Sequence, residues 1–158
     1  MAGFNTKEQV GAEGYVTIRH FRGNIEDGNL VSEETRKNLV VTSGKVYIAK
    51  HIMSVFNAGA PDDLTRIALG SGTTAPSLSD ISLQSQLDSA PFASTPVLNG
   101  NTITFIANFP PGVATGAVSE AGILTGGAIP TLFNRVVFPV KNKSPNDSFQ
   151  IVWAITIV

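Results

Sequence analysis

The chain has 158 residues, of which 42% are hydrophobic and only 15% are charged, and this length suits one domain with a hydrophobic core. Eleven basic and twelve acidic residues leave a net charge of −1, which argues against a nucleic-acid-binding protein, because such proteins carry a clear basic excess. The absence of cysteine excludes disulfides, thiolate metal sites and cysteine nucleophiles. We see no signal peptide and no apolar run of about 20 residues, so we expect no contact with a membrane.

The N-terminal part begins with a polar, weakly periodic segment, residues 1–13, which we interpret as an arm. In a monomer this arm would be a loosely ordered terminus, whereas in an oligomer it would reach a neighbouring subunit. Alternation of side chains over residues 14–22 predicts a β-strand. A hairpin turn is expected over residues 23–29, with the hairpin resuming briefly at residues 30–31. We interpret residues 32–37 as a polar connection.

One helix is predicted, over residues 44–56, after a short buried strand at residues 38–41. Thr42 or Ser43 is expected to cap its N-terminus. The helix carries one apolar stripe at helical spacing, which we expect to pack against the rest of the protein: Val46, Ala49, Met53 and Phe56, widened by Ile48 and Ile52.

The most distinctive stretch of the sequence runs from Leu64 to Leu87. It begins as a strand that ends at Gly70, and the glycines at 70 and 72 free the backbone for a tight reversal. The stretch contains no cysteine, histidine or lysine, and Asp80 is its one carboxylate. We therefore interpret it as structural rather than catalytic.

From residue 89 onward, strands and turns alternate at regular spacing. The predicted strands are residues 94–98, 101–109, 117–125, 132–140 and 148–158. The last four favour a meander or a Greek key. We therefore predict a mainly β fold for residues 14–158, an antiparallel β-sandwich of about seven or eight strands with one packed α-helix.

Few residues of the sequence could support catalysis or bind a cofactor. His20 and His51 are the only histidines, and no G-x-S-x-G motif is present. Residues 70–74, GSGTT, resemble a phosphate-binding loop, but the lysine that such a loop needs does not follow. One turn carries oxygen ligands that could hold Ca²⁺ weakly, although a plain hairpin loop is favoured: Glu26, Asp27 and Asn29. We predict no catalytic residue, no cofactor and no metal site.

Glu120 stands out because it lies in the middle of an otherwise apolar strand. Two interpretations remain open from the sequence. In the first, the side chain faces solvent on an edge strand. In the second, Glu120 is a structural buried acid that pairs with Arg66 or Arg135 or accepts hydrogen bonds from backbone amides. Neither interpretation makes Glu120 catalytic.

Several short motifs occur in an order that resembles a known class of protein. They are Asn38-Leu-Val-Val-x-x-Gly44, Ile67-Ala-Leu-Gly70-x-Gly72-Thr-Thr-Ala-Pro76 with Asp80 and Leu83 after it, Ser119-Glu120-Ala-Gly-Ile123, Leu132-Phe-x-Arg135-x-x-Phe138 and Ile151-Val-Trp153-x-Ile155. This order, which covers roughly residues 14–158, resembles small structural proteins of tailed-bacteriophage virions. Such proteins belong to the tail, baseplate, collar or fibre-attachment region, and sometimes to the capsid.

The resemblance implies a non-enzymatic virion protein that is assembled in the cytoplasm of the bacterial host. Its partners would be other copies of itself, in a homo-oligomer, and other virion proteins or fibres. The low charge of the chain agrees with this, because the centres of interfaces are depleted of charged residues. We expect the arm, the first strand and the loop after Gly70 to supply contact residues: Phe4, Val10, Tyr15, Gly70, Gly72 and Pro76.

Two alternatives to a tail component are open. The first is a capsid decoration or head-fibre protein, which would differ in location and symmetry. The second is a carbohydrate-binding β-sandwich module, which would need an exposed aromatic platform. Trp153 is the only tryptophan, and its apolar strand favours a place in the core.

Overall fold

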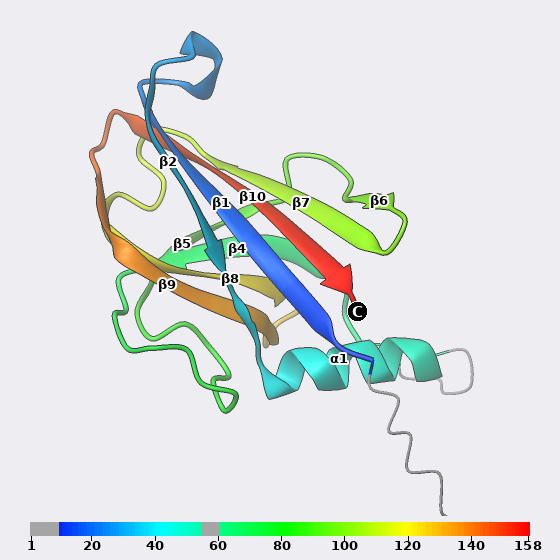
Figure 1. The fold of residues 1–158 in the computed structure, drawn as a ribbon. Coiled ribbons are helices and arrows are strands. Elements are labelled where there is room, and N and C mark those ends of the chain that lie inside the picture. The colour runs from blue at the N-terminus through cyan, green and yellow to red at the C-terminus, as the bar shows by residue number, and fades with distance from the viewer. Residues whose placement is uncertain (1–9, 55–60) are drawn as a thin grey trace, which may run out of the picture.

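Two antiparallel β-sheets face each other and enclose the hydrophobic core, and one helix lies at one end of them (Figure 1). The computed structural model describes residues 10–54 and 61–158. Within these residues each sheet has five strands. The prediction of a mainly β, antiparallel sandwich with one helix is confirmed, with ten strands in place of the seven or eight expected.

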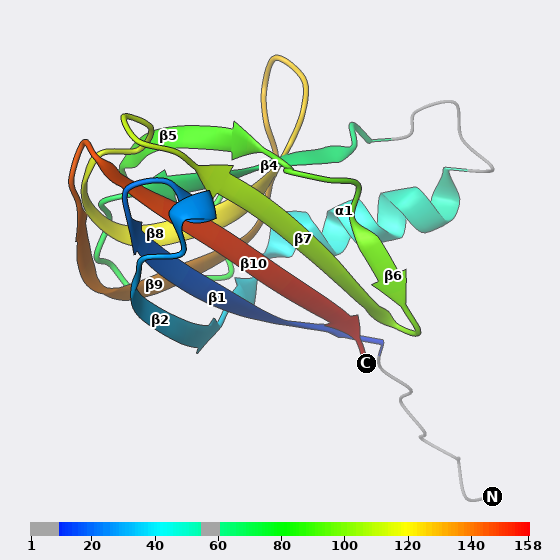
Figure 2. The same cartoon turned by 90° about the horizontal axis from the view of Figure 1, so that it is seen from above.

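The first sheet is built around the C-terminal strand. It contains β1 (Ala12–Arg22), β2 (Leu30–Lys37), β6 (Val97–Asn99), β7 (Thr102–Phe109) and β10 (Asp147–Ile157) in the order β2-β1-β10-β7-β6. The strands β1, β10 and β7 lie side by side (Figure 2). Beyond β10, Val158 exchanges two backbone hydrogen bonds with Gly11, so the end of the described chain is tied to the start of β1.

The second sheet contains β3 (Leu39–Val40), β4 (Leu64–Gly70), β5 (Gln86–Pro91), β8 (Gly116–Thr125) and β9 (Leu132–Lys143) in the order β3-β9-β8-β4-β5. The chain crosses from β7 in the first sheet to β8 in the second, and from β9 back to β10, which lies beside β7. Of the two arrangements predicted for the last four long strands, this is the Greek key.

Several predicted elements differ from the structure in their bounds or in their presence. Strand β1 begins at Ala12, so the arm ends earlier than residue 13. The polar connection predicted at residues 32–37 is part of edge strand β2, in which cross-strand pairs such as Arg19–Glu33 replace apolar contacts. Strand β5, which has no clear alternation, was not predicted, and the strand predicted at residues 94–98 is reduced to β6.

The passage of the chain from β2 to β3 is fixed by buried Asn38. Its backbone N–H donates to the carbonyl of Gly14 at 2.9 Å, and its Oδ1 accepts a hydrogen bond of 2.7 Å from Trp153 Nε1. Trp153 is fully buried between the sheets, as predicted. A buried indole N–H without a partner would be costly, so Asn38 both turns the chain into the second sheet and completes the core.

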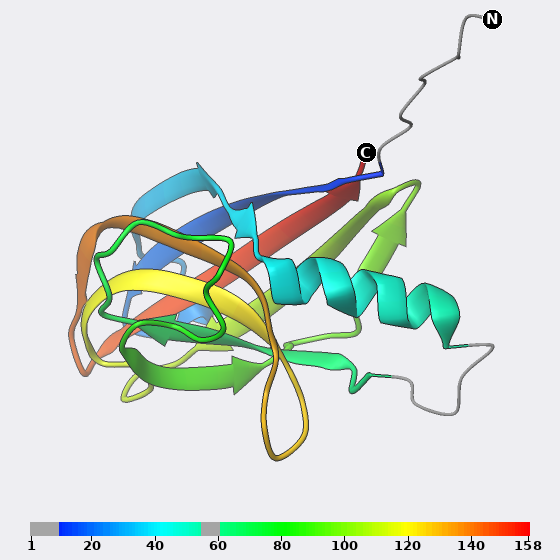
Figure 3. The same ribbon diagram turned by 90° about the horizontal axis from the view of Figure 1, so that it is seen from below.

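Helix α1 (Thr42–Met53) packs through only part of the face that was predicted. Its N-cap is Val41, because the Ser43 hydroxyl donates to the Leu132 carbonyl instead of capping the helix. Half-buried Ile48, which belongs to the widened stripe, packs on the core together with Tyr47. The other described members of the stripe are exposed, and Phe56 lies outside the described residues. The exposed members are Val46, Ala49, Ile52 and Met53. Only the N-terminal part of α1 lies against β9, and its C-terminal half extends beyond the sheets (Figure 3).

Gly44 allows the first turn of α1 to approach β9, and this contact gives a test. A Cβ at residue 44 would clash with the Phe133 carbonyl oxygen. In an unconstrained helix, Gly→Ala stabilises by about 1 kcal/mol. Here we expect Gly44→Ala to lower the free energy of unfolding in urea by about 1–3 kcal/mol. The neighbouring exposed substitution Lys45→Ala is the control and should change little; an increase in stability of Gly44→Ala would contradict the close contact.

Candidate functional site

A loop, residues 71–85, crosses the outer face of the second sheet over β8 and β9 (Figure 3). Beneath it lies a small apolar cluster that is separate from the main core. The cluster consists of Val41, Ala68, Leu83, Leu124 and Leu132. Leu83 is the one residue of the loop in this cluster. The other contacts that attach the loop to the sheet, described next, are polar.

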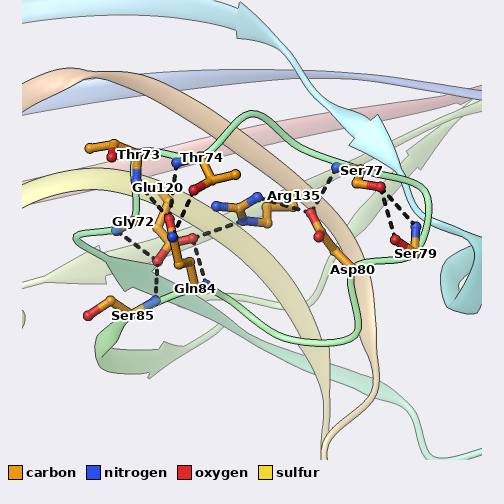
Figure 4. A network of polar contacts seen from close by, with 10 residues as sticks. All are labelled: Gly72, Thr73, Thr74, Ser77, Ser79, Asp80, Gln84, Ser85, Glu120 and Arg135. Carbon is orange, nitrogen blue, oxygen red and sulfur yellow. Dashed lines mark hydrogen bonds and ion pairs between the residues drawn. The ribbon is translucent and has the colours of Figure 1, made fainter.

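The polar attachment centres on Glu120 of β8, which is fully buried (Figure 4). Its Oε1 accepts hydrogen bonds from the backbone N–H groups of Gly72 at 2.9 Å and Ser85 at 2.7 Å. Its Oε2 accepts from the Gln84 N–H at 3.0 Å and from Arg135 Nε at 2.9 Å. A carboxylate has about four lone-pair sites, and all are therefore engaged. Of the two interpretations of Glu120, the buried acid is confirmed. Its partners are Arg135 and the backbone amides of the loop together.

Two glycines make room for the Glu120 carboxylate. A Cβ at Gly70 would lie 2.5 Å from Glu120 Oε1, and a Cβ at Gly72 would lie 2.6 Å from it. A larger residue at either position would require the Glu120 carboxylate or the adjoining part of the loop to shift. We expected Gly70 and Gly72 to be contact residues for a partner, but both are buried, Gly70 at the end of β4 and Gly72 within the loop. Their role in this structure is internal.

Arg135 of β9 connects Glu120 to the far end of the loop. Its side chain is only 2% exposed, and its Nη1 donates to Asp80 Oδ2 at 3.0 Å. The same Asp80 oxygen accepts from the Ser77 N–H at 2.9 Å. The formal charges of two carboxylates and one guanidinium leave the network at −1. Pairing of this kind offsets the desolvation of buried charges, and loss of one partner leaves another uncompensated.

A third acceptor, Gln84, fixes the turn at the start of the loop. Its Oε1 accepts from the N–H groups of Thr73 and Thr74, each at 3.0 Å, and its Nε2 donates to Thr74 Oγ1 at 2.8 Å. The sequence analysis did not foresee this role of Gln84 or the pairing of Asp80 with Arg135. Asp80 did belong to the motif on which the resemblance rests, so its position in that motif was the one indication in the sequence that it has a specific role.

The other expected contact residues lie away from this network. Val10 is 76% exposed at the start of the described chain, and Tyr15 is 49% exposed on the outer face of the first sheet. Pro76 is half-buried in the loop. Phe4 lies outside the described residues.

The two histidines lie on different elements, β1 and α1, and each contacts a neighbouring side chain. Buried His20 of β1 lies with its Nε2 2.8 Å from Asp147 Oδ2. Lys143, also buried, donates to the Asp147 backbone carbonyl at 2.7 Å. His51 lies on α1 with its ring 4.5 Å from that of Tyr47. In the described part of the chain, no three residues of the types His, Cys, Asp or Glu gather in a way that could hold a metal ion.

No family model matches the chain, and no curated protein or solved structure is significantly similar to it. Among residues 10–54 and 61–158, no helix is both long and apolar enough to cross a membrane. What is known of the site therefore comes from its geometry. That geometry fixes a loop on a sheet and directs its polar groups inward.

Replacing Glu120 with glutamine tests the central role of the carboxylate. The glutamine amide would place N–H donors where backbone N–H groups and Arg135 already donate, and Arg135 would lose its buried counter-charge. We expect Glu120→Gln to lower the free energy of unfolding in urea by about 3–5 kcal/mol. The matched control is Glu33→Gln at the exposed Arg19–Glu33 pair, where we expect a loss of at most about 1 kcal/mol. Equal small losses in both variants would contradict the proposed role.

Asp147 gives a prediction for the dependence of stability on pH. Burial raises its pKa, but hydrogen bonds from His20 and Ser144 and the charge of His20 together hold the pKa below its ordinary value of 3.8. A carboxyl group whose pKa is lower in the folded state than in the unfolded state stabilises the fold at pH values above its unfolded-state pKa. This stabilisation is lost as the pH falls through its folded-state pKa. Below about pH 3.8 we therefore expect the native chain to lose stability more steeply than Asp147→Asn in urea unfolding. Exposed Asp88→Asn is the control; parallel pH profiles for the native chain and Asp147→Asn would contradict the assignment.

Proposed function

We propose that the chain is a non-enzymatic structural component of a tailed-phage virion, in the tail, baseplate or collar, where it docks neighbouring virion proteins or fibres. One observation carries the proposal. The motifs on which the resemblance rests are far apart in the sequence, yet their residues join in one network. Gly72 and Glu120 are 48 residues apart, and Asp80 and Arg135 are 55 apart. A chance resemblance of short motifs would not predict that their residues bond to each other.

The chemistry of the network also supports a scaffold. Glu120 has no free lone pair, and the polar groups of the loop mostly bond within it or to the sheet beneath. These bonds hold a 15-residue loop in one shape on a rigid sheet. A protein that docks neighbours needs surfaces of fixed shape, because ordering a loop on binding costs free energy.

The exposed surface near α1 is apolar enough for contact with other proteins. Val46 of α1 and Leu78 and Ile81 of the loop are exposed and line one hollow together. Single exposed apolar residues are normal, whereas several that share one hollow are typical of interaction sites. The charged fraction of 15% agrees with this surface chemistry.

A carbohydrate-binding module is less well supported. Trp153 is fully buried and donates to Asn38, so it does not form a platform for a sugar. A capsid decoration or head-fibre protein would share the scaffold role and differ only in its place on the particle. The following experiment distinguishes a position on the capsid from a position in the tail, baseplate or collar.

Isolation of virions tests the proposed function. Particles should be purified by density gradient from a lysate of cells that produce the chain. We expect the chain in the particles at a fixed ratio to the major capsid subunit by quantitative mass spectrometry, and immunogold label at the tail, baseplate or collar. Label spread over the head would instead support the capsid alternative. A chain that stays in the soluble fraction and is missing from particles would overturn the virion assignment.

A further inference from the structure

One side of α1 borders a continuous apolar trough at the end of the sandwich. Two open hollows, of about 560 and 670 Å³, meet at Ile48 of α1 and Ile157 of β10, which line both. Each is within the size range of small-ligand pockets, roughly 300–1,000 Å³. We call this surface the α1 trough and define it by six of its residues: Val10, Lys45, Ile48, Ile52, Phe105 and Ile157.

The far half of the α1 trough has little cover in the described protomer. Ile52 is 69% exposed, although it lies beside buried Phe105 in the same hollow. An isolated helix of about 12 residues is marginal in water, and most helical stability comes from packing of an apolar face. Helix α1 has 12 residues, and its contacts with the sheets are mainly with β9. A partner in the trough would add packing to its C-terminal half.

We propose that the α1 trough receives residues 4–9 of the N-terminal arm of a second copy of this chain, with Phe4 as the anchor. This inference rests on the proposed function, since it names the surface by which copies in an assembly hold each other. Phe4 is the only aromatic residue before Val10. Aromatic side chains that fill apolar hollows are typical anchors of interfaces.

The arm is long enough for this contact. From Val10 to Phe4 there are six residue steps, which span at most about 20 Å in an extended chain. The seven steps of helix from Lys45 to Ile52 cover about 10 Å. Val10 itself lines the near end of the trough. An arm that enters beside Val10 of a neighbour can therefore bring Phe4 to Ile52 and Phe105.

The charges of the arm and the trough complement each other in order. Lys45 lies at the near end of the trough and Asp63 at the far end. Along the arm from Val10 toward Phe4, Glu8 comes first and Lys7 follows. The arm therefore carries a charge opposite to that of Lys45 and a charge opposite to that of Asp63. Exposed pairs contribute little affinity but favour one orientation of the segment.

The backbone at Gly11 favours a second copy over the same chain. Gly11 donates to the Val158 carbonyl at 2.7 Å and accepts from the Val158 N–H at 2.9 Å, so the chain is still extended along β1 there. Val10 is β-branched and prefers an extended backbone, and residues 4–9 contain no glycine or proline. Because β10 lies between β1 and β7, entry into the far hollow of the chain's own trough needs a turn across β10 directly after this pairing. In the arrangement that we propose, the arm instead continues from β1 into the trough of a second copy, and two copies exchange arms around a two-fold axis.

Cysteine cross-linking tests the proposal, because the natural chain has no cysteine. Full-length Phe4→Cys and Ile52→Cys chains are mixed and oxidised mildly, and the mixed disulfide dimer is measured by mass spectrometry. We expect roughly tenfold more of it than from Phe4→Cys mixed with Glu26→Cys, an exposed site near η1 (Ile25–Asp27) at the other end of β1. Equal yields would overturn the proposal. So would a Phe4→Cys/Ile52→Cys chain that links only within itself.

Sedimentation provides a second measurement that does not depend on a disulfide. We expect Phe4→Ala to weaken self-association by roughly tenfold to a hundredfold, because the buried ring is lost, while Phe4→Leu keeps most of it. Unchanged self-association in Phe4→Ala would overturn the proposal. Each of these failures leaves the virion assignment standing, since that assignment depends on the presence of the chain in particles.

Discussion

The structure depends on one buried carboxylate. Glu120 is removed from water, which costs several kcal/mol unless its charge is paired and its lone pairs are filled. Arg135 supplies the charge, and three backbone N–H groups of the loop fill the remaining sites. Since these amides belong to residues on both ends of the loop, the loop cannot leave the sheet without exposing an unsatisfied ion pair. The narrow approach at Gly70 and Gly72 makes this arrangement possible.

This interaction gives the two sheets different surroundings. In the second sheet, β8 is buried on both faces from Val118 to Thr125, because the loop covers its outer side. In the first sheet, the outer face stays open and carries side chains such as Tyr15 and Thr17. The polar groups of the loop are directed inward, while apolar residues around α1 remain exposed. Such a division suits a protein whose contacts with neighbours depend on shape and apolar area, which is the basis of the scaffold role that we propose.

The sequence predicts the parts of the fold in which side-chain pattern and environment agree. Strands β1, β7 and β10 alternate between core and surface, and each was predicted within two residues at its start. Residues 32–37 of β2 were not predicted as strand, because cross-strand charge and threonine pairs, which a single strand does not reveal, take the place of apolar residues. The packed face of α1 was predicted correctly only at Ile48, because apolar residues lie on several sides of the helix and the contact of Gly44 with β9 selects one of them. For Glu120, strand context indicated a special position, but only the tertiary structure identifies Arg135 rather than Arg66 as its partner.

Amide hydrogen exchange of the native chain tests the account most directly, because it reports on the loop without any substitution. If Glu120 locks the loop to the sheet, the amides of Gly72, Gln84 and Ser85 open only in large unfolding events. The account predicts that these three amides exchange as slowly as the amides in the middle of β8. Exchange at the rate of an unprotected loop amide would contradict it, and would mean that the buried network does not hold residues 71–85 in solution.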